Sequence, residues 1–140
     1  MEIANKKIKY FILVLSMVTI SSCDSYYQKQ IGDFYFIRYI DLKRTMDIGF
    51  GNKESSEGLV DPTVFEVYWN EKYILVKTHP DFLENRLLTE YYVIEKVRFG
   101  EKRAKDYMIG PINEEQYEME IKKLKLNINN MEHILYNDLK

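Results

Sequence analysis

Cys23 is the only cysteine in the 140-residue chain, and its thiol is the side chain best suited to covalent chemistry. A lone thiol can act as a nucleophile, take part in redox chemistry or carry a lipid. With no second cysteine, the chain cannot form an internal disulfide, so its fold must depend on its core. The residues that precede Cys23 decide between these uses, and they favour lipid attachment.

The 22 residues before Cys23 have the parts of a secretory signal peptide. Three lysines within the first nine residues form a positive start, and the apolar run over residues 10–20 is 11 residues long. A helix that spans a bilayer needs about 20 apolar residues, so this run is too short for a stable anchor. The sequence therefore predicts a cleaved leader over residues 1–22. The alternatives are an ordinary secreted protein with a chance cysteine, or an N-terminal core helix.

Cys23 follows one aliphatic and two small residues, an order that resembles the lipobox of bacterial lipoproteins. The three preceding residues are Ile20, Ser21 and Ser22. The resemblance implies cleavage before Cys23, diacylglycerol on its sulfur and an acyl chain on the new amino group. Two or more acyl chains hold a protein durably at a bilayer. We therefore expect a lipid-anchored protein of the cell envelope. Asp24, the residue after the lipidated cysteine, does not decide which membrane leaflet holds it, so the protein is expected to be periplasmic or on the outer surface.

The mature chain is predicted to form a single domain. Cleavage leaves 118 residues, a size that suits one domain and not two. Residues 23–31 read as the lipidated cysteine and a short tether, and residues 32–140 as the domain. Removing the leader's three lysines and one glutamate leaves 17 basic and 21 acidic residues, a net charge of −4. This mildly acidic charge disfavours nucleic acid as a partner and disfavours binding to anionic headgroups by charge.

Apolar residues alternate with polar ones in short runs, which is typical of strands. We expect an α+β fold: an antiparallel sheet of four to six strands, open or curled into a partial barrel, with one C-terminal helix packed on it. The expected strands cover residues 34–40, 45–50, 64–69, 73–78, 91–97 and 106–109. Residues 52–57 read as an exposed polar loop and residues 81–88 as one helical turn.

The runs 64–69 and 73–78 are expected to form a hairpin that turns at Glu71 and Lys72. This register places the apolar side chains on one face and opposite charges across from each other. The expected pairs are Trp69 with Ile74, Val67 with Val76, and Glu66 with Lys77.

The best helix signal covers residues 113–125, after a break predicted at Gly110 and Pro111. Asn113 is a suitable N-cap with Gln116 three residues on, and the charges follow the helix dipole. Residues 127–140 are ambiguous; a short second helix would place four apolar side chains on one face and His133 on its polar face. These four are Met131, Ile134, Leu135 and Leu139.

Four motifs together are similar to those of a family of uncharacterised small bacterial lipoproteins, a domain of unknown function. They are Gly32-Asp33-Phe34-Tyr35, Asp61-Pro62-Thr63-Val64 with the Tyr68-Trp69 hairpin, Tyr91-Tyr92-Val93-Ile94, and Gly110-Pro111-Ile112 before a Glu-rich helix. The resemblance covers roughly residues 32–126. It implies an arrangement of strands and turns, and it implies no particular activity.

Motifs for catalysis or cofactor binding are missing from the sequence. There is no glycine-rich phosphate loop and no Gly-x-Ser-x-Gly elbow. His79 and Asp81 are too few for zinc, which takes three or four protein ligands, and we interpret His79 as a solvated turn residue. The many carboxylates are explained as surface charge. We therefore expect no metal and no cofactor.

The mature chain is rich in aromatic residues: 11 tyrosines, six phenylalanines and Trp69 lie beyond Cys23. Most fall in strand-like runs, so a tyrosine-rich core is the simpler interpretation, and a binding face is the alternative. The candidate binding residues are Tyr35, Tyr39, Tyr68, Tyr91 and Tyr92. Of three functional hypotheses we rank first a non-catalytic envelope module that binds a protein or peptide. An immunity-type inhibitor of a toxin comes second, and an enzyme on cell-wall or glycan substrate third.

Replacing Cys23 with serine tests the lipid anchor. We expect the Cys23→Ser variant to lose incorporation of a fatty-acid analogue and to leave the membrane fraction, because the hydroxyl does not accept the diacylglycerol. The measurement is metabolic labelling with fractionation of cells, beside the unchanged protein. A variant that still carries label and stays with membranes would contradict the lipobox interpretation.

Overall fold

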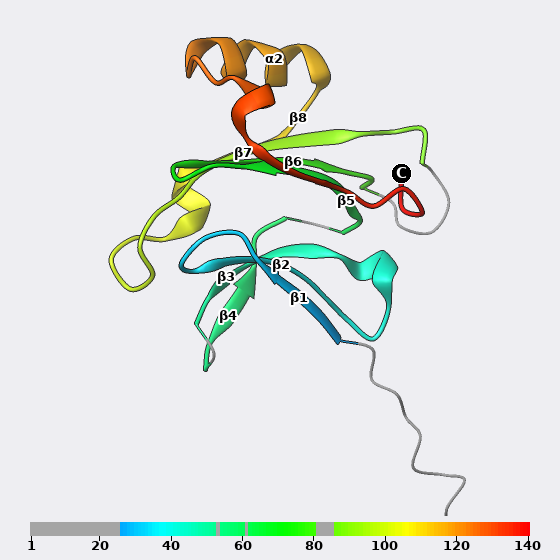
Figure 1. Cartoon of the computed structure of the whole chain (residues 1–140), viewed down its shortest axis with the longest axis vertical. Coiled ribbons are helices and arrows are strands. Elements are labelled where there is room, and N and C mark those ends of the chain that lie inside the picture. Colours follow the sequence, from blue (N-terminus) through cyan, green and yellow to red (C-terminus); the bar gives the residue numbers. More distant parts are fainter. Residues whose placement is uncertain (1–25, 53, 61, 81–85) are drawn as a thin grey trace, which may run out of the picture.

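The computed structural model describes residues 26–52, 54–60, 62–80 and 86–140, and it shows three layers. A five-stranded sheet lies in the middle, a four-stranded sheet covers one of its faces and helix α2 (Glu114–Lys123) covers the other (Figure 1). The four-stranded sheet has the order β1 (Tyr26–Gln30), β2 (Tyr35–Ile40), β3 (Asp47–Gly51), β4 (Ser56–Gly58). The five-stranded sheet has the order β8 (Met108–Ile112), β7 (Glu90–Glu95), β6 (Tyr73–Thr78), β5 (Val64–Trp69), β9 (Glu132–Leu135).

All neighbouring strands are antiparallel, as expected, but they form two sheets instead of one. Neither sheet closes into a barrel. The chain passes from one sheet to the other between β4 and β5, where Leu59 and Val60 are buried. The amide of Leu59 donates to Ile48 and that of Val64 to Met46, so the crossing segment stays bonded to β3 and the residue before it. Three short 3₁₀ helices complete the described elements: η2 (Lys43–Thr45), η3 (Ala104–Tyr107) and η4 (Ile128–Asn130).

The main core lies between the two sheets. Ile37 and Ile48 of the four-stranded sheet and Val67, Val76 and Ile94 of the five-stranded sheet are all fully buried in one cluster. Each such side chain contributes about 1.5–3 kcal/mol when it leaves water. This burial explains why β2, with apolar residues on both faces, is an inner strand of its sheet.

A second apolar cluster lies on the other face of the five-stranded sheet, under α2. Tyr117 of the helix packs on Tyr91 of β7 with ring centroids 4.8 Å apart, and Leu75, Val93 and Met131 join them. The predicted capping box is confirmed: the Asn113 side chain accepts the amide proton of Gln116, and the Gln116 side chain accepts that of Asn113.

The predicted hairpin register is confirmed. β5 and β6 pair Glu66 with Lys77, and Val67 with Val76 and Trp69 with Ile74 follow in the same register. The four apolar side chains are buried, and the Lys77 ammonium lies 2.8 Å from the Glu66 carboxylate. The Asn70 side chain accepts the amide protons of Lys72 and Tyr73, which stabilises the turn.

Four local expectations were wrong because pairing at sheet edges outweighed local sequence signals. Residues 26–30 of the predicted tether form β1 and pair with β2. Gly110 and Pro111 lie inside β8, where an edge strand tolerates the missing proline N–H. Residues 132–135 form β9 on the edge of β5 and not part of a helix. Within the predicted polar loop, residues 56–58 form β4. The helical turn expected over residues 81–88 falls largely outside the described residues.

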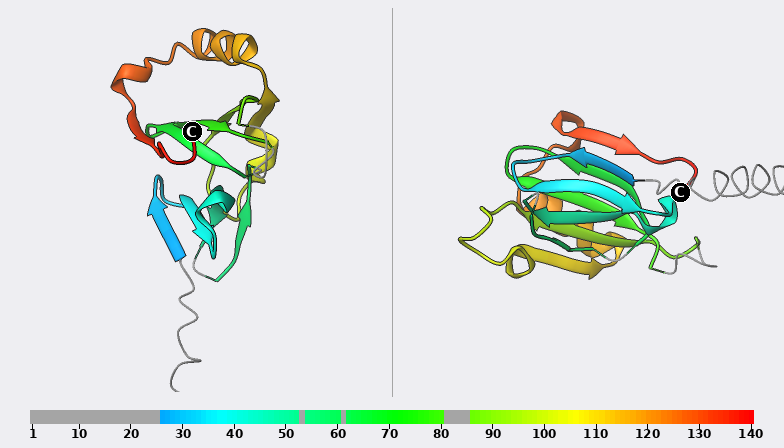
Figure 2. Two further views of the ribbon diagram at one scale, coloured as in Figure 1. Left: turned by 90° about the vertical axis from the view of Figure 1, so that its right-hand side faces the viewer. Right: turned by 90° about the horizontal axis from the view of Figure 1, so that it is seen from below.

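Strands β1 and β9 lie on the same side of the molecule, although they belong to different sheets and are about a hundred residues apart in the chain (Figure 2). The hydroxyl groups of Tyr27, on β1, and Tyr136, directly after β9, are 2.9 Å apart. The Lys29 ammonium lies 5.7 Å from the ring centre of Trp69. Both contacts join β1 to the five-stranded sheet, and the second of them involves Trp69, which lines the pocket described below.

Candidate functional site

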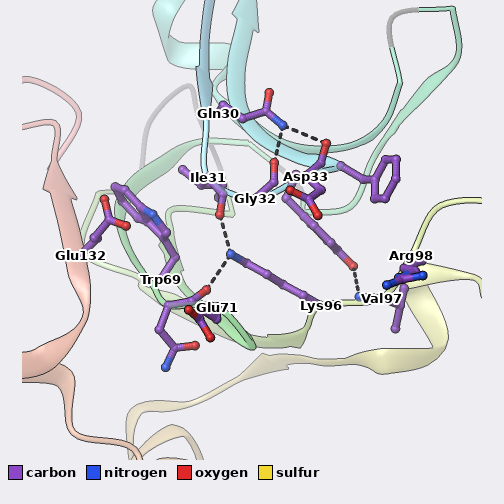
Figure 3. Close-up of a pocket in the computed structure, with 13 residues that line it drawn as sticks. Gln30, Ile31, Gly32, Asp33, Trp69, Glu71, Lys96, Val97, Arg98 and Glu132 are labelled. Carbon is purple, nitrogen blue, oxygen red and sulfur yellow. Dashed lines mark hydrogen bonds between the residues drawn. The ribbon is translucent and has the colours of Figure 1, made fainter.

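A pocket of about 550 Å³ opens at one end of the two sheets (Figure 3). Its walls come from the β1–β2 turn, the β5–β6 turn, the segment after β7 and the first residue of β9. The lining residues are Gln30, Ile31, Gly32, Asp33, Phe34, Tyr35, Trp69, Asn70, Glu71, Lys96, Val97, Arg98 and Glu132. Segments from both sheets therefore have to meet for this pocket to exist.

Lys96 joins the two turns that form opposite walls of the pocket. Its ammonium donates to the carbonyl oxygen of Ile31, in the β1–β2 turn, and to that of Asn70, in the β5–β6 turn, at 2.6 Å (Figure 3). A Cβ atom on Gly32 would lie 3.0 Å from the Lys96 Nζ atom, so the glycine gives the side chain room. Burial lowers the pKa of Lys96, while the carboxylates of Glu132, Asp33 and Glu71 act in the opposite direction.

The inner wall of the pocket is aromatic and is fixed by polar contacts. Tyr35 is buried, and its hydroxyl accepts the amide proton of Val97 at 3.0 Å. Burial raises the pKa of Tyr35, so this hydroxyl stays protonated at neutral pH. Trp69 is buried on the opposite wall. These two rings give the pocket a rigid apolar surface.

The rim of the pocket is acidic on balance. Asp33, Glu71 and Glu132 are exposed and carry three negative charges, against the positive charges of Lys96 and Arg98. With three negative charges against two positive ones, the rim is suited to a ligand group that is cationic or donates hydrogen bonds, and the Lys96 ammonium already uses two of its donor N–H groups on carbonyl oxygens. The side chain of Gln30 donates to backbone oxygens of Gly32 and Asp33 and orders this turn.

The five tyrosines predicted from the sequence do not form one exposed surface. Tyr35 and Tyr92 are buried between the sheets, and Tyr91 is buried under α2. Tyr39 is half-buried and stacks on Tyr27. Tyr68 is half-buried on the other face of the five-stranded sheet. Of the five, only Tyr35 lines the pocket.

A polar network centred on Glu66 joins three strands on the helix side of the five-stranded sheet. The Glu66 carboxylate accepts hydrogen bonds from Tyr68 at 2.8 Å and from His133 Nε2 at 3.0 Å, and it pairs with Lys77. The rings of Tyr68 and His133 stack with centroids 4.2 Å apart. His133 therefore lies on β9 and bonds a buried carboxylate, instead of lying on the polar face of a helix as expected.

The charges of this network follow from its burial. Burial alone would raise the pKa of Glu66, but hydrogen bonds from Lys77, Tyr68 and His133 outweigh it and lower the pKa. Burial, with the nearby Glu66 carboxylate, raises the pKa of Tyr68 to about 12, so Tyr68 remains a donor. Glu66 is thus an ionised carboxylate with three donors, which suits a structural role joining β5, β6 and β9.

His79 is buried, and the interpretation of it as a solvated turn residue was wrong. Its ring stacks on Phe65 with centroids 4.4 Å apart, and Nδ1 donates to the carbonyl oxygen of Leu88 at 2.8 Å. Its backbone exchanges two hydrogen bonds with Thr63. His79 therefore fixes the end of the hairpin against the crossing segment.

Sequence reasoning missed Lys96, Gln30 and Glu132 as pocket residues and Glu66 with His133 as a network. The opposite charges at Glu66 and Lys77 were the one available signal, because they lie in a hairpin. Two of the contacts that define these sites join residues 65 or more positions apart, Lys96 with Ile31 and His133 with Glu66. Within the described ranges, no group of three or more His, Cys, Asp or Glu residues could hold a metal ion.

In its described residues, the protein has two antiparallel sheets and one α-helix, with an open pocket where turns of both sheets meet. A family described as a protein of unknown function, DUF3997, matches residues 31–133. The chain belongs to this family, which agrees with the resemblance to a domain of unknown function. No curated protein and no solved structure matches the chain significantly. In the part of the chain that the structure describes, no helix is long and apolar enough to cross a membrane.

Replacing Lys96 tests whether it holds the two pocket walls together. Lys96→Met keeps the length of the side chain but removes both hydrogen bonds and leaves two carbonyl oxygens without this donor. We expect the free energy of unfolding to fall by about 1–3 kcal/mol, measured by urea denaturation. Lys72→Met is the matched control, since Lys72 is exposed and its ammonium makes only surface contacts, a long ion pair with Glu95 at 3.6 Å and a contact with the Tyr73 ring at 5.1 Å. Equal losses in both variants would contradict the role of Lys96.

The Glu66 network predicts a pH dependence of stability. The pKa of Glu66 is lower in the folded protein than its ordinary value of 4.5, so ionised Glu66 stabilises the fold above pH 4.5. This stabilisation is lost as the pH falls through the folded-state pKa. We expect Glu66→Gln to lose about 1–3 kcal/mol at neutral pH. Its difference from the unchanged protein should shrink in urea denaturation as the pH falls below 4.5 and through the lowered folded-state pKa. Glu95→Gln, at an exposed ion pair, is the control. A difference that stays constant or grows in acid would refute the assignment.

Proposed function

We propose that this chain is a lipid-anchored bacterial envelope protein that binds a protein or peptide partner and catalyses no reaction. The observation that carries the proposal is the open pocket of about 550 Å³, with its aromatic inner wall and its polar rim. Recognition sites commonly combine large aromatic contact areas with a few fixed polar groups. In this pocket Trp69 and Tyr35 provide the aromatic area, Lys96 is a polar group fixed by two carbonyl oxygens, and the rim adds three exposed carboxylates.

An extended peptide segment suits the surroundings of the pocket. β1 ends the four-stranded sheet and β9 ends the five-stranded sheet, and both strands reach the pocket, at Gln30 and Glu132. An edge strand offers backbone hydrogen-bonding groups to a partner strand, while a neighbouring pocket receives its side chain. The two edges on one side of the molecule supply both parts of this arrangement (Figure 2).

The charge of the rim favours a partner segment with a basic side chain. Three carboxylates, those of Asp33, Glu71 and Glu132, surround the opening, and Lys96 is held by two backbone carbonyls. A lysine or arginine of the partner would therefore gain favourable electrostatic interaction near the rim. Arg98 on the same rim would repel such a group on its side, which orients the basic side chain toward Glu71 and Glu132.

Site-specific photo-cross-linking in native membranes tests this function. A photoreactive amino acid at Glu71, on the rim, should capture a partner protein, because its side chain is exposed beside the pocket. The matched control is Glu115, which is equally charged and exposed but lies on α2, on the far side of the five-stranded sheet. The captured protein is identified by mass spectrometry, which also separates an envelope partner from a toxin.

Two outcomes would count against the proposal. Equal capture at the two positions, or none at Glu71, would contradict a partner at the pocket. Turnover of a glycan, peptide or ester substrate that disappears on mutation of one rim carboxylate would replace binding by catalysis.

A further inference from the structure

Three large apolar side chains are exposed together at the end of the molecule where β1 begins. Tyr26 is 60% exposed, Ile40 56% and Leu42 47%. Tyr26 and Ile40 are direct cross-strand partners at the end of the β1–β2 pair, and Leu42 follows two residues later. In Figures 1 and 2 this end also contains η2 and the C-terminus, and it lies opposite the β1–β2 turn that lines the pocket.

The position of Cys23 restricts what can cover this apolar end. Only two residues separate Cys23 from Tyr26, the first residue of β1. A fully extended chain spans at most about 3.6 Å per residue, so Tyr26 lies within about 11 Å of Cys23. The strand pairing of Tyr26 with Ile40 fixes the direction from which the chain enters the fold. An acylated Cys23 would therefore hold this end, and not the pocket end, against the bilayer.

We propose that Tyr26, Ile40 and Leu42 form a membrane-contact surface that inserts into the lipid interface; this inference rests on the proposed lipid anchor. Tyrosine suits the interface because its ring is apolar and its hydroxyl is polar. Aliphatic side chains beside it gain free energy by leaving water. This surface would thus contact the same bilayer into which the acyl chains of Cys23 insert.

The charges around this surface nearly cancel, so the proposed contact with lipid depends on the apolar side chains. Lys43 and Arg44 are exposed next to Leu42, but Lys43 pairs with Asp138 at 2.6 Å and Asp41 lies beside them. The local charge is therefore nearly balanced, and anionic headgroups add little. Zwitterionic lipid should be sufficient for the contact.

A consequence for the pocket follows from the direction of β1. Gln30, at the far end of the strand, lies about 13 Å from Tyr26 at the usual rise per residue. With Tyr26 at the interface, β1 carries the pocket away from the lipid and into the aqueous space. The proposed partner then approaches from the side opposite the membrane.

Environment-sensitive probes on single cysteines test this orientation. Cys23 is the only cysteine, so its acylation leaves an introduced cysteine as the only free thiol. Ile40→Cys and Leu42→Cys are labelled with a polarity-sensitive fluorophore in the full acylated protein, reconstituted in phosphatidylcholine vesicles with or without a lipid-borne quencher. Met119→Cys on α2 is the matched control, because Met119 is also apolar and 62% exposed.

We expect blue-shifted emission and severalfold stronger quenching at positions 40 and 42 than at position 119, with the same result when anionic lipid is added. Equal quenching at all three positions would overturn the membrane-contact surface and leave the lipid anchor intact. The protein without an added cysteine reports on the anchor separately. If it takes up the label at Cys23, acylation is absent, and the proposed anchor and this inference both fail.

Discussion

The architecture depends on one constraint: the five-stranded sheet is apolar on both faces, so each face needs a cover. On β6, Ile74 and Val76 point to one face and Leu75 to the other, and all three are fully buried. A single layer of strands could not keep both sets out of water. The four-stranded sheet covers one face and α2 with the segment after it covers the other, which produces the three layers in Figure 1. With no disulfide available from one cysteine, this burial is the main source of stability.

Two polar groups fix the edges of the structure, Lys96 between the two sheets and Glu66 within the five-stranded sheet. Lys96 joins turns from different sheets and so determines the shape of the pocket. Glu66 joins β5 and β6 to β9, a short edge strand whose Ile134 and Leu135 also pack against the main core. Both groups are partly withdrawn from water, and both have several partners, which offsets the cost of burying a charge. The pocket is therefore supported by interactions that are specific as well as apolar.

The functional proposals fit a molecule with two different ends. One end presents a pocket with aromatic walls and an acidic rim, next to two strand edges. The other presents exposed apolar side chains within a few residues of the predicted lipid site. A short connection between Cys23 and β1 makes the fold itself set the orientation, because β1 is bonded to β2 and cannot act as a flexible tether. In the proposed arrangement, anchoring and recognition would take place at opposite ends of the β1–β2 strand pair.

The sequence by itself determined the features that depend on neighbouring residues. The β5–β6 hairpin register follows from the alternation of apolar residues and from the charges of Glu66 and Lys77, all within about a dozen positions. The capping box at Asn113 is equally local. Family membership was also accessible, because strand and turn motifs are themselves local patterns.

Only the tertiary structure decided which strands share a sheet, which tyrosines are core residues and where the pocket lies. Residues 132–135 carry a weak local signal, and they become β9 because the edge of β5 is available for pairing. In the sequence, Lys96 is indistinguishable from a surface lysine. Only the structure shows that its ammonium bonds to the carbonyl oxygen of Ile31, 65 positions earlier. Such contacts join segments that are far apart in the chain. Their formation depends on the packing of the whole core, and no short window of sequence contains that information.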